Sequence, residues 1–248
     1  EAKNVLRKDF HVRQLYYPYR LWRNKVSKPI RLVFSVYSNM IYRLFEYRFN
    51  KLEDYSSIEL IRTKNYSLQD MHISLEDLMD IRRNTVVTKS DNISETVIPF
   101  IQADSVNRLI SLLENMESNP MTAEQIIELM DFVGRQYNYY VSAGIYLGIF
   151  ERELENKTTK LTEIGVSLCR MTYKERQLKL VSLMVEHRIF ADFFDYVIDN
   201  NGELPSKQQV CDKMRELNVC KSESTMERRA CSVLSWLKWI FNLPHLAE

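Results

Sequence analysis

The feature that most constrains the fold is a change in the periodicity of apolar residues along the chain. Three runs rich in β-branched and aromatic residues lie within residues 30–68, separated by Ser38-Asn39 and by the polar segment NKLEDYS. Such runs, bounded by polar turns, predict three strands in a β-meander. From Asp104 onward the apolar residues recur at helical spacing, which predicts a mainly helical remainder. The expected fold class is α+β, mainly α.

Weaker signals divide the chain into three regions. A helix is expected over residues 11–24, with an interruption at Pro18, and a short helix should begin at the N-cap residue Ser74. Residues 85–101 show no periodic pattern and are interpreted as a linker. We therefore expect a first domain over residues 1–92, a second over residues 93–172 and a third over residues 173–248.

The second region has its signals in the order of a winged helix. Two helical segments are separated from a third by a polar turn at Gly134, and two short strands flank Asn156 before another helix near Thr162. Helix, turn, helix and β-wing is the winged-helix order. The third region should contain a long amphipathic stretch over residues 173–200 and two further helices, which together suggest a second helix-turn-helix module.

Charge is distributed unevenly along the chain. Residues 1–69 contain 14 Lys or Arg against 6 Asp or Glu, a net charge of +8, which leaves 20 against 27, or −7, for the rest. This asymmetry suggests that a polyanion meets the first part, although charges that merely decorate a surface would look the same.

The four cysteines form no C-x-x-C pair and the four histidines are scattered, so neither a structural zinc site nor a disulfide framework is indicated. There is no run of 18 apolar residues and no leader pattern; a soluble cytoplasmic protein without a membrane partner is expected.

Glu1-Ala2-Lys3 has the E-x-K spacing of the nuclease motif PD…(D/E)-x-K. In that chemistry two carboxylates hold a divalent ion such as Mg²⁺ against the scissile phosphate, and the lysine positions the attacking water. On a strand, residues i and i+2 point to the same side, so Glu1 and Lys3 would face one metal. Three residues also match by chance in most chains of this size, and an ordinary charged pair at a chain end is the alternative.

Longer runs of the sequence carry a resemblance to a known family. EAKNVLRKDFHVRQLYYPYRLW, KPIRLVFSVYSNMIYRLFEYRF and SSIELIRTKNYSL resemble a region of type II restriction endonucleases of the PD-(D/E)xK superfamily. The resemblance implies a nuclease-core remnant in which Glu1 and Lys3 are catalytic, Glu1 binds the metal and the partner Asp lies upstream. It also implies Gln14 near the metal, although Pro18 stands where the Q-x-x-x-Y pattern has its tyrosine. A chain that lacks the upstream Asp should bind DNA but cut it poorly.

A second resemblance covers about 140 residues. PFIQADSVNRLISLLENM, GRQYNYYVSAGIYLGIF, KLTEIGVSLCRMTYKERQLKLVSLMVEHRIF and STMERRACSVLSWLKWIFNL resemble the winged-helix region found C-terminal to such nuclease cores. It implies a recognition helix from about Arg135 to Ile149, whose early polar side chains reach bases and phosphates. Alternatively Tyr137, Tyr140 and Tyr146 form the core there and the polar residues are only solvated.

The candidate DNA-binding residues are basic or polar and lie in three groups. They are Arg7, Lys8 and Arg13 near the start, Arg135, Gln136, Asn138, Tyr139 and Ser142 on the recognition helix, and Arg228 and Arg229 near the end. Arginine suits phosphate because its planar fork donates paired hydrogen bonds. Glu223 and Glu227 could instead bind the last two arginines in helix salt bridges. Trp236 and Trp239 are expected to be core or packing residues.

Three functional hypotheses follow. The leading one is a site-specific DNA endonuclease that cleaves phosphodiester bonds with Mg²⁺ and binds double-stranded DNA through its winged-helix modules, with a homodimer left open. The second is a non-enzymatic winged-helix transcription regulator. The third treats the acidic helical region as a protein-docking or dimerisation module. Binding to DNA should weaken steeply with added salt, whereas an apolar docking interface should respond little.

Overall fold

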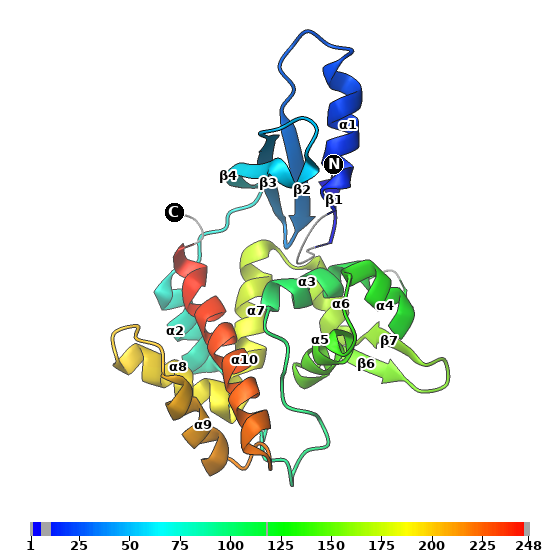
Figure 1. Ribbon diagram of the computed structural model, residues 1–248. Coiled ribbons are helices and arrows are strands. Elements are labelled where there is room, and N and C mark those ends of the chain that lie inside the picture. The colour runs from blue at the N-terminus through cyan, green and yellow to red at the C-terminus, as the bar shows by residue number, and fades with distance from the viewer. Residues whose placement is uncertain (1, 6–10, 118, 246–248) are drawn as a thin grey trace. The chain divides into compact units, whose positions relative to one another are not determined.

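The computed structural model describes residues 2–5, 11–117 and 119–245, and the chain divides into two compact units (Figure 1). The first unit is residues 1–69 and the second is residues 70–248. The described residues form ten α-helices and two small sheets, which confirms the expected α+β, mainly helical class. Within these ranges, every helix is too short or too polar to cross a membrane.

The first unit is built around a four-stranded sheet. Its strands are β1 (Ala2–Lys3), β2 (Leu32–Ser38), β3 (Ile41–Phe49) and β4 (Ile58–Ser67), in the order β1-β2-β3-β4, and the short helix η1 (Tyr55–Ser57) precedes β4. β1 runs parallel to β2, and β2, β3 and β4 are antiparallel. Asn39 and Met40 both have positive φ and join β2 to β3 in a two-residue turn, a conformation that suits tight hairpins. The predicted β-meander is therefore confirmed.

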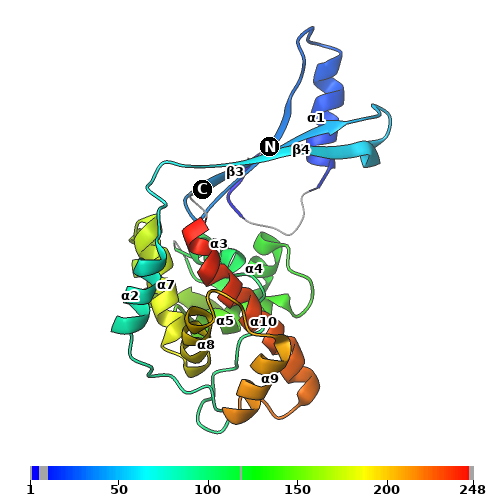
Figure 2. The ribbon, with the colours of Figure 1, turned by 90° about the vertical axis from the view of Figure 1, so that its left-hand side faces the viewer.

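Helix α1 (Arg13–Arg23) covers one face of this sheet (Figures 1 and 2). Alternate side chains of β2, those of Leu32, Phe34 and Val36, are buried in one cluster with Leu15 and Tyr16 of α1. This pattern follows from the alternation of strand side chains between two faces. The other face of the sheet points away from α1.

The expected interruption at Pro18 is wrong. Pro18 lies inside α1, which continues without a break from Arg13 to Arg23. A proline in a helix removes one backbone hydrogen bond, here the one to the carbonyl of Gln14. Pro18 is on the exposed side of the helix, where water can solvate that carbonyl, and the buried side chains on the other side hold the helix together.

The second unit begins with α2 (Leu75–Asn84), which a capping box between Ser74 and Asp77 starts as predicted. Asp77 also accepts a 2.8 Å hydrogen bond from Lys174 of helix α7 (Tyr173–Val185). Arg82 makes a bidentate ion pair with Asp195 of helix α8 (Arg188–Asp199). These bonds join α2 to the helical unit, although the sequence signals grouped it with the strands.

The middle of the chain contains the predicted helices and hairpin. In chain order they are α3 (Val106–Asn115), β5 (Met121–Thr122), α4 (Ala123–Met130), α5 (Gln136–Tyr146), β6 (Phe150–Glu153), β7 (Thr158–Leu161) and α6 (Glu163–Arg170). The three strands form an antiparallel sheet in the order β5-β7-β6. Thr162 caps α6. The hairpin and the helices on either side of Gly134 are thus present where the sequence predicted them.

The last part of the chain is helical. After α7 and α8 come α9 (Lys207–Glu216), α10 (Glu223–Asn242) and the short helix η2 (Leu243–His245). The long stretch expected over residues 173–200 is divided, because α7 ends at Val185 and α8 starts at Arg188. His187 between them has an extended backbone and a buried side chain. Trp236 of α10 is fully buried and donates a 2.9 Å hydrogen bond to the carbonyl of Ala103, which agrees with its expected core position.

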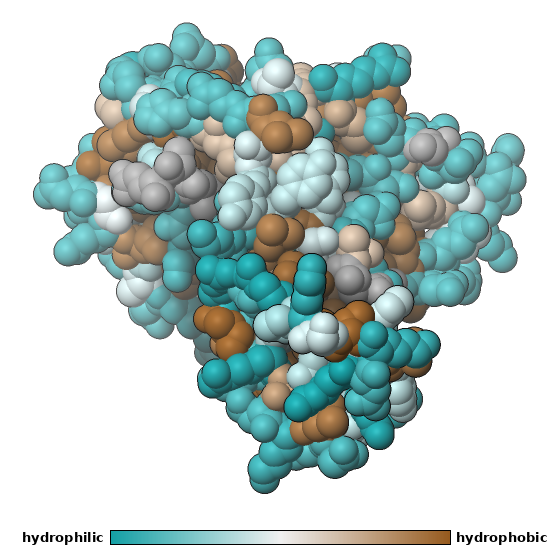
Figure 3. Space-filling view, turned by 90° about the horizontal axis from the view of Figure 1, so that it is seen from above, coloured by the Kyte–Doolittle hydropathy of each residue, from teal (hydrophilic) through white to brown (hydrophobic). Residues whose placement is uncertain are grey.

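Some of the exposed large hydrophobic side chains are isolated on the surface. Leu68, Val97 and Leu154 are each at least 85% exposed, and they belong to the linker after β4, the segment before α3 and the hairpin loop. On the face of the molecule that Figure 3 presents, hydrophobic side chains lie in small groups among hydrophilic ones. Isolated exposed hydrophobic residues of this kind are ordinary for a folded protein.

Candidate nucleic-acid interface

The turn before α5 positions that helix. Asp131 ends α4 in the left-handed conformation, and Gly134 also has a positive φ of 55°; glycine adopts this conformation without steric cost. The amide oxygen of Gln136 accepts a 3.0 Å hydrogen bond from the backbone of Val133. Gln136, a predicted DNA-binding residue, therefore also shapes the turn.

The buried side of α5 is tightly fixed. A β-carbon added to Gly144 would lie 2.0 Å from the Phe150 ring, so only glycine permits this close approach of α5 to β6. The Tyr140 ring stacks on Phe132 at 4.8 Å, and its hydroxyl donates a 2.7 Å hydrogen bond to Asp104. Burial, with that hydrogen bond, raises the pKa of Tyr140 above its ordinary range. The helix is thus held rigidly, with its other side directed outward.

The outward side carries most of the candidate residues of the recognition helix. Arg135 and Asn138 are exposed, whereas Tyr139 and Ser142 are half-buried. Arg152 of β6 donates a 3.3 Å hydrogen bond to the amide oxygen of Asn138 and so joins this surface. Sequence reasoning missed Arg152 because three glutamates surround it in ERELE, and only the folded hairpin brings it to α5.

The hairpin has balanced charges overall but not locally. Residues 150–161 contain three basic and three acidic side chains. Lys160 lies 3.4 Å from Glu151 and 3.5 Å from Glu153, so this group of three keeps a net charge of −1. Arg152, Glu155 and Lys157 are exposed outside these two pairs. The cations that a polyanion could reach are therefore those next to α5 and in the hairpin loop.

The residues implied as catalytic are only partly described. Glu1 lies outside the described residues, as do Arg7 and Lys8. Lys3 is half-buried in β1 and is the register partner of Val36, whose side chain packs under α1. Lys3 therefore projects from the same face of the sheet that α1 covers. Gln14 of α1 is half-buried and lines a hollow of about 400 Å³ against β2, so the structure brings Lys3 and Gln14 to one side of the sheet.

Helix α1 contributes a basic and aromatic surface. Its residues 13–23 contain three arginines and no Asp or Glu. Arg13, a predicted DNA-binding residue, is exposed at the first position of α1. Trp22 is 53% exposed, with the ammonium group of Lys25 5.9 Å from the centre of its ring. Such a combination of cations and exposed rings suits a phosphate-bearing partner.

The second predicted surface is on α10. Arg228 is exposed and Arg229 is half-buried. The two glutamates that we considered as their partners pair with α9 instead, since Glu223 binds Arg215 and Glu227 lies 3.7 Å from a lysine. In the described structure these glutamates therefore do not form the alternative salt bridges with Arg228 and Arg229. Arg228 remains a candidate for phosphate contact.

A metal site is not assembled by the described residues. Within residues 2–5, 11–117 and 119–245, no three His, Cys, Asp or Glu side chains come together as metal ligands would. In the first unit, Glu46 binds two arginines and Glu59 binds Arg48. The described carboxylates of that unit do not fit a Mg²⁺ site, and no catalytic step through a metal can be built on them.

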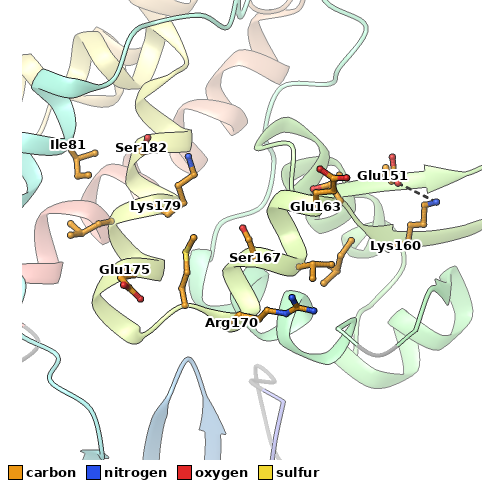
Figure 4. A pocket seen from close by; sticks show the side chains of 14 residues that line it. Ile81, Glu151, Lys160, Glu163, Ser167, Arg170, Glu175, Lys179 and Ser182 are labelled. Atoms are coloured by element: carbon orange, nitrogen blue, oxygen red, sulfur yellow. Dashed lines mark ion pairs between the residues drawn. The ribbon is translucent and has the colours of Figure 1, made fainter.

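A hollow in the second unit has mixed charge (Figure 4). It has a volume of about 1000 Å³ and lies between the hairpin, α6, α7 and α2. Its charged lining consists of Lys160, Arg170, Lys179, Glu151, Glu163 and Glu175. Three positive and three negative side chains give this hollow no preference for a polyanion.

Comparisons with known proteins identify families but no function. Residues 1–67 match the family described as Domain of unknown function (DUF6997), and this segment coincides with the first compact unit. Residues 108–245 match the family described as Domain of unknown function (DUF7226). No curated protein and no solved structure matches the chain. Because the second match covers more than half of the 248 residues, the chain belongs to the DUF7226 family.

Proposed function

We propose that this protein binds double-stranded DNA through α5 and the β6–β7 hairpin. The observation that carries the proposal is the arrangement α3–β5–α4–α5–β6–β7 with strand order β5-β7-β6, which is the element order of a winged helix. In helix-turn-helix modules the second helix of the motif enters the major groove and presents its early side chains to bases. Here that helix is α5.

The side chains on this surface suit the two kinds of contact that DNA offers. Arg135 and Arg152 can donate charge-assisted hydrogen bonds to phosphate oxygens, and Asn138 can pair with a base edge. Asn138 and Arg152 are already joined by a hydrogen bond, so helix and hairpin present one continuous surface. Because the second unit is acidic as a whole, these local cations must carry the attraction to DNA.

A finer proposal is that the protein is, or is part of, a site-specific DNA endonuclease. Its support is the resemblance of the first unit to restriction endonucleases, the net charge of +8 on residues 1–69, and the position of Lys3 and Gln14 on one side of the sheet. The Mg²⁺ ligands that this chemistry needs would have to include groups outside the described residues, with Glu1 among them.

One experiment tests both levels of the proposal. Long DNA of mixed sequence is incubated with the full-length protein and Mg²⁺, beside Glu1→Ala and Lys3→Ala and beside Lys51→Ala as a matched control at an exposed lysine. Discrete fragments that disappear in the first two variants only would support an endonuclease. Shifted DNA without fragments would favour a winged-helix regulator, and DNA that is neither shifted nor cut would contradict the proposed function.

A further inference from the structure

Three tyrosines lie side by side on the face of the first sheet opposite α1. The strand register pairs Tyr37 with Tyr42 and Tyr42 with Tyr66, and directly paired residues project from the same face. Val36, the neighbour of Tyr37, is buried against α1, so the tyrosines project from the other face. They are 43%, 41% and 51% exposed, and the rings of Tyr37 and Tyr42 lie 4.5 Å apart. We call these three residues the tyrosine row.

Positive charge lies beside the tyrosine row on the same face. Lys64 and Arg62 precede Tyr66 on β4 by two and four residues, and side chains at this spacing share one face. Arg62 and Arg31 both bind Glu46, at 2.5 Å and 2.6 Å. Lys64 is exposed and forms no ion pair within the described part of the chain. Three cations and one carboxylate leave a net charge of +2.

The face is hollowed between the charges and the aromatic end. A depression of about 210 Å³ is lined by Tyr66 and Lys64, by the two arginines and Glu46, and by two aliphatic side chains. One wall of the depression is thus aromatic. The rest of the lining carries Lys64 and the two arginines, which pair with Glu46. A nucleotide has the matching parts, since its base can stack on a tyrosine ring and its phosphate can bind Lys64 or the arginines.

We propose that the tyrosine row and its flanking cations bind a run of unpaired nucleotides. The bases of a duplex are stacked inside the helix and cannot meet exposed rings, whereas unpaired bases can. A second copy of the same face fits poorly, because each copy would bring a charge of +2 against the other. The proposal goes beyond the proposed function, since it concerns another ligand and the sheet face opposite the one from which Lys3 projects, and it does not depend on α5.

The spacing of the three tyrosine rings determines how many nucleotides the face can bind. Neighbouring strands lie roughly 4.8 Å apart, so three rings on three strands span roughly 10 Å. Sheet-based modules of this kind stack two or three bases on their aromatic residues. The face therefore fits a short single-stranded segment rather than a long one, with its backbone continuing toward Lys64.

The test is fluorescence anisotropy of the intact protein with labelled single strands of twelve thymidines or twelve uridines. Tyr42→Ala should raise the Kd about 5- to 140-fold, the factor equivalent to about 1–3 kcal/mol for one stacked base. Tyr42→Phe keeps the ring and should stay within about twofold of the unchanged protein. Tyr55→Ala, at another exposed tyrosine of the same unit, is the matched control and should bind normally.

A second variant keeps the test valid if Tyr42→Ala disturbs the sheet. Lys64→Gln changes an exposed side chain without loss of packing and should reduce the slope of log K against log salt by about 0.7, the value for one phosphate of a single strand.

The thymidine and uridine strands distinguish DNA from RNA as the natural source. The proposal is overturned if neither strand binds at 50 mM salt, or if Tyr42→Ala and Lys64→Gln both bind as the unchanged protein does. Loss of duplex binding in α5 variants, with single-strand binding retained, separates this surface from the proposed function.

Discussion

Removal of the Asp91 carboxylate should destabilise the second unit strongly. Asp91 is buried and accepts a 2.6 Å hydrogen bond from the Tyr146 hydroxyl. The ring nitrogen Nδ1 of His187 lies 3.1 Å from the same oxygen, and the backbone nitrogen of Ile189 donates to the other oxygen at 3.1 Å. One side chain thus ties α5, the break between α7 and α8, and the first turn of α8 together.

The expected loss in the free energy of unfolding follows from the number of hydrogen-bond partners that Asp91 has. A buried donor left without an acceptor costs about 1–3 kcal/mol, so three donors set a range of roughly 3–9 kcal/mol before relaxation. Loss of one member of a buried charged network typically costs about 3–5 kcal/mol once the surroundings relax. We expect the lower range, about 3–5 kcal/mol, for Asp91→Ala. Asp91→Asn retains one acceptor oxygen and should lose less.

Urea unfolding at neutral pH, followed by circular dichroism, measures these differences. Asp199→Ala is a matched control because Asp199 is exposed at the end of α8, and its free energy of unfolding should change by less than about 0.5 kcal/mol. A loss below about 1 kcal/mol in Asp91→Ala would show that these three bonds do not hold the unit together, because it is smaller than the cost of even one unsatisfied donor.

Three further predictions concern packing and pH. Gly144→Val should lower the free energy of unfolding by at least about 1–3 kcal/mol in urea unfolding, because the new side chain meets the Phe150 ring; unchanged stability would contradict the close approach of α5 to β6. Trp236→Ala should cost about 3–5 kcal/mol in the same assay, and a cost near zero would contradict its place in the core. The Lys174 hydrogen bond lowers the pKa of Asp77 to about 2, so its stabilising contribution is complete above about pH 4 and is lost as the pH falls toward 2. Asp77→Asn should therefore flatten the fall in stability between pH 4 and 2, and an unchanged slope would show that this pair does not contribute.

Local sequence patterns were enough to predict the helices and strands but not the long-range contacts between them. The strands over residues 30–68 and the hairpin around Asn156 were predictable because their turns and alternation lie within a few residues. The local sequence of residues 85–101 predicts a linker, yet Asp91 in this segment is buried against Tyr146 and His187. Its partners are 55 and 96 residues away in the sequence, and no local pattern reports such distances.

The helix breaks illustrate the same limit. Residues 173–200 have one amphipathic pattern, but the structure ends α7 before His187, whose side chain is buried. Pro18 was expected to interrupt a helix, and the packing of α1 on the sheet overrides that local preference. In both cases tertiary contacts decide what the local sequence leaves open.

The candidate site was predictable to a similar degree. The position of α5 followed from Gly134 and the polar residues after it, and its outward side carries Arg135 and Asn138 as expected. Arg152 could not be placed, because its contact with Asn138 depends on the hairpin folding back onto α5. The tyrosine row was equally hidden, since only the strand register aligns residues from three strands.

The most direct test of the account is the salt dependence of duplex DNA binding by the intact protein and by a variant with Arg135→Ala and Arg152→Ala. Arg83→Ala, an exposed arginine paired within α2, is the matched control. Each lost phosphate contact should reduce the slope of log K against log salt by about 1. We expect a steep slope for the unchanged protein and for Arg83→Ala, and a slope lower by about 2 for the double variant. Binding that is absent at low salt, independent of salt, or equal in all three proteins would contradict it.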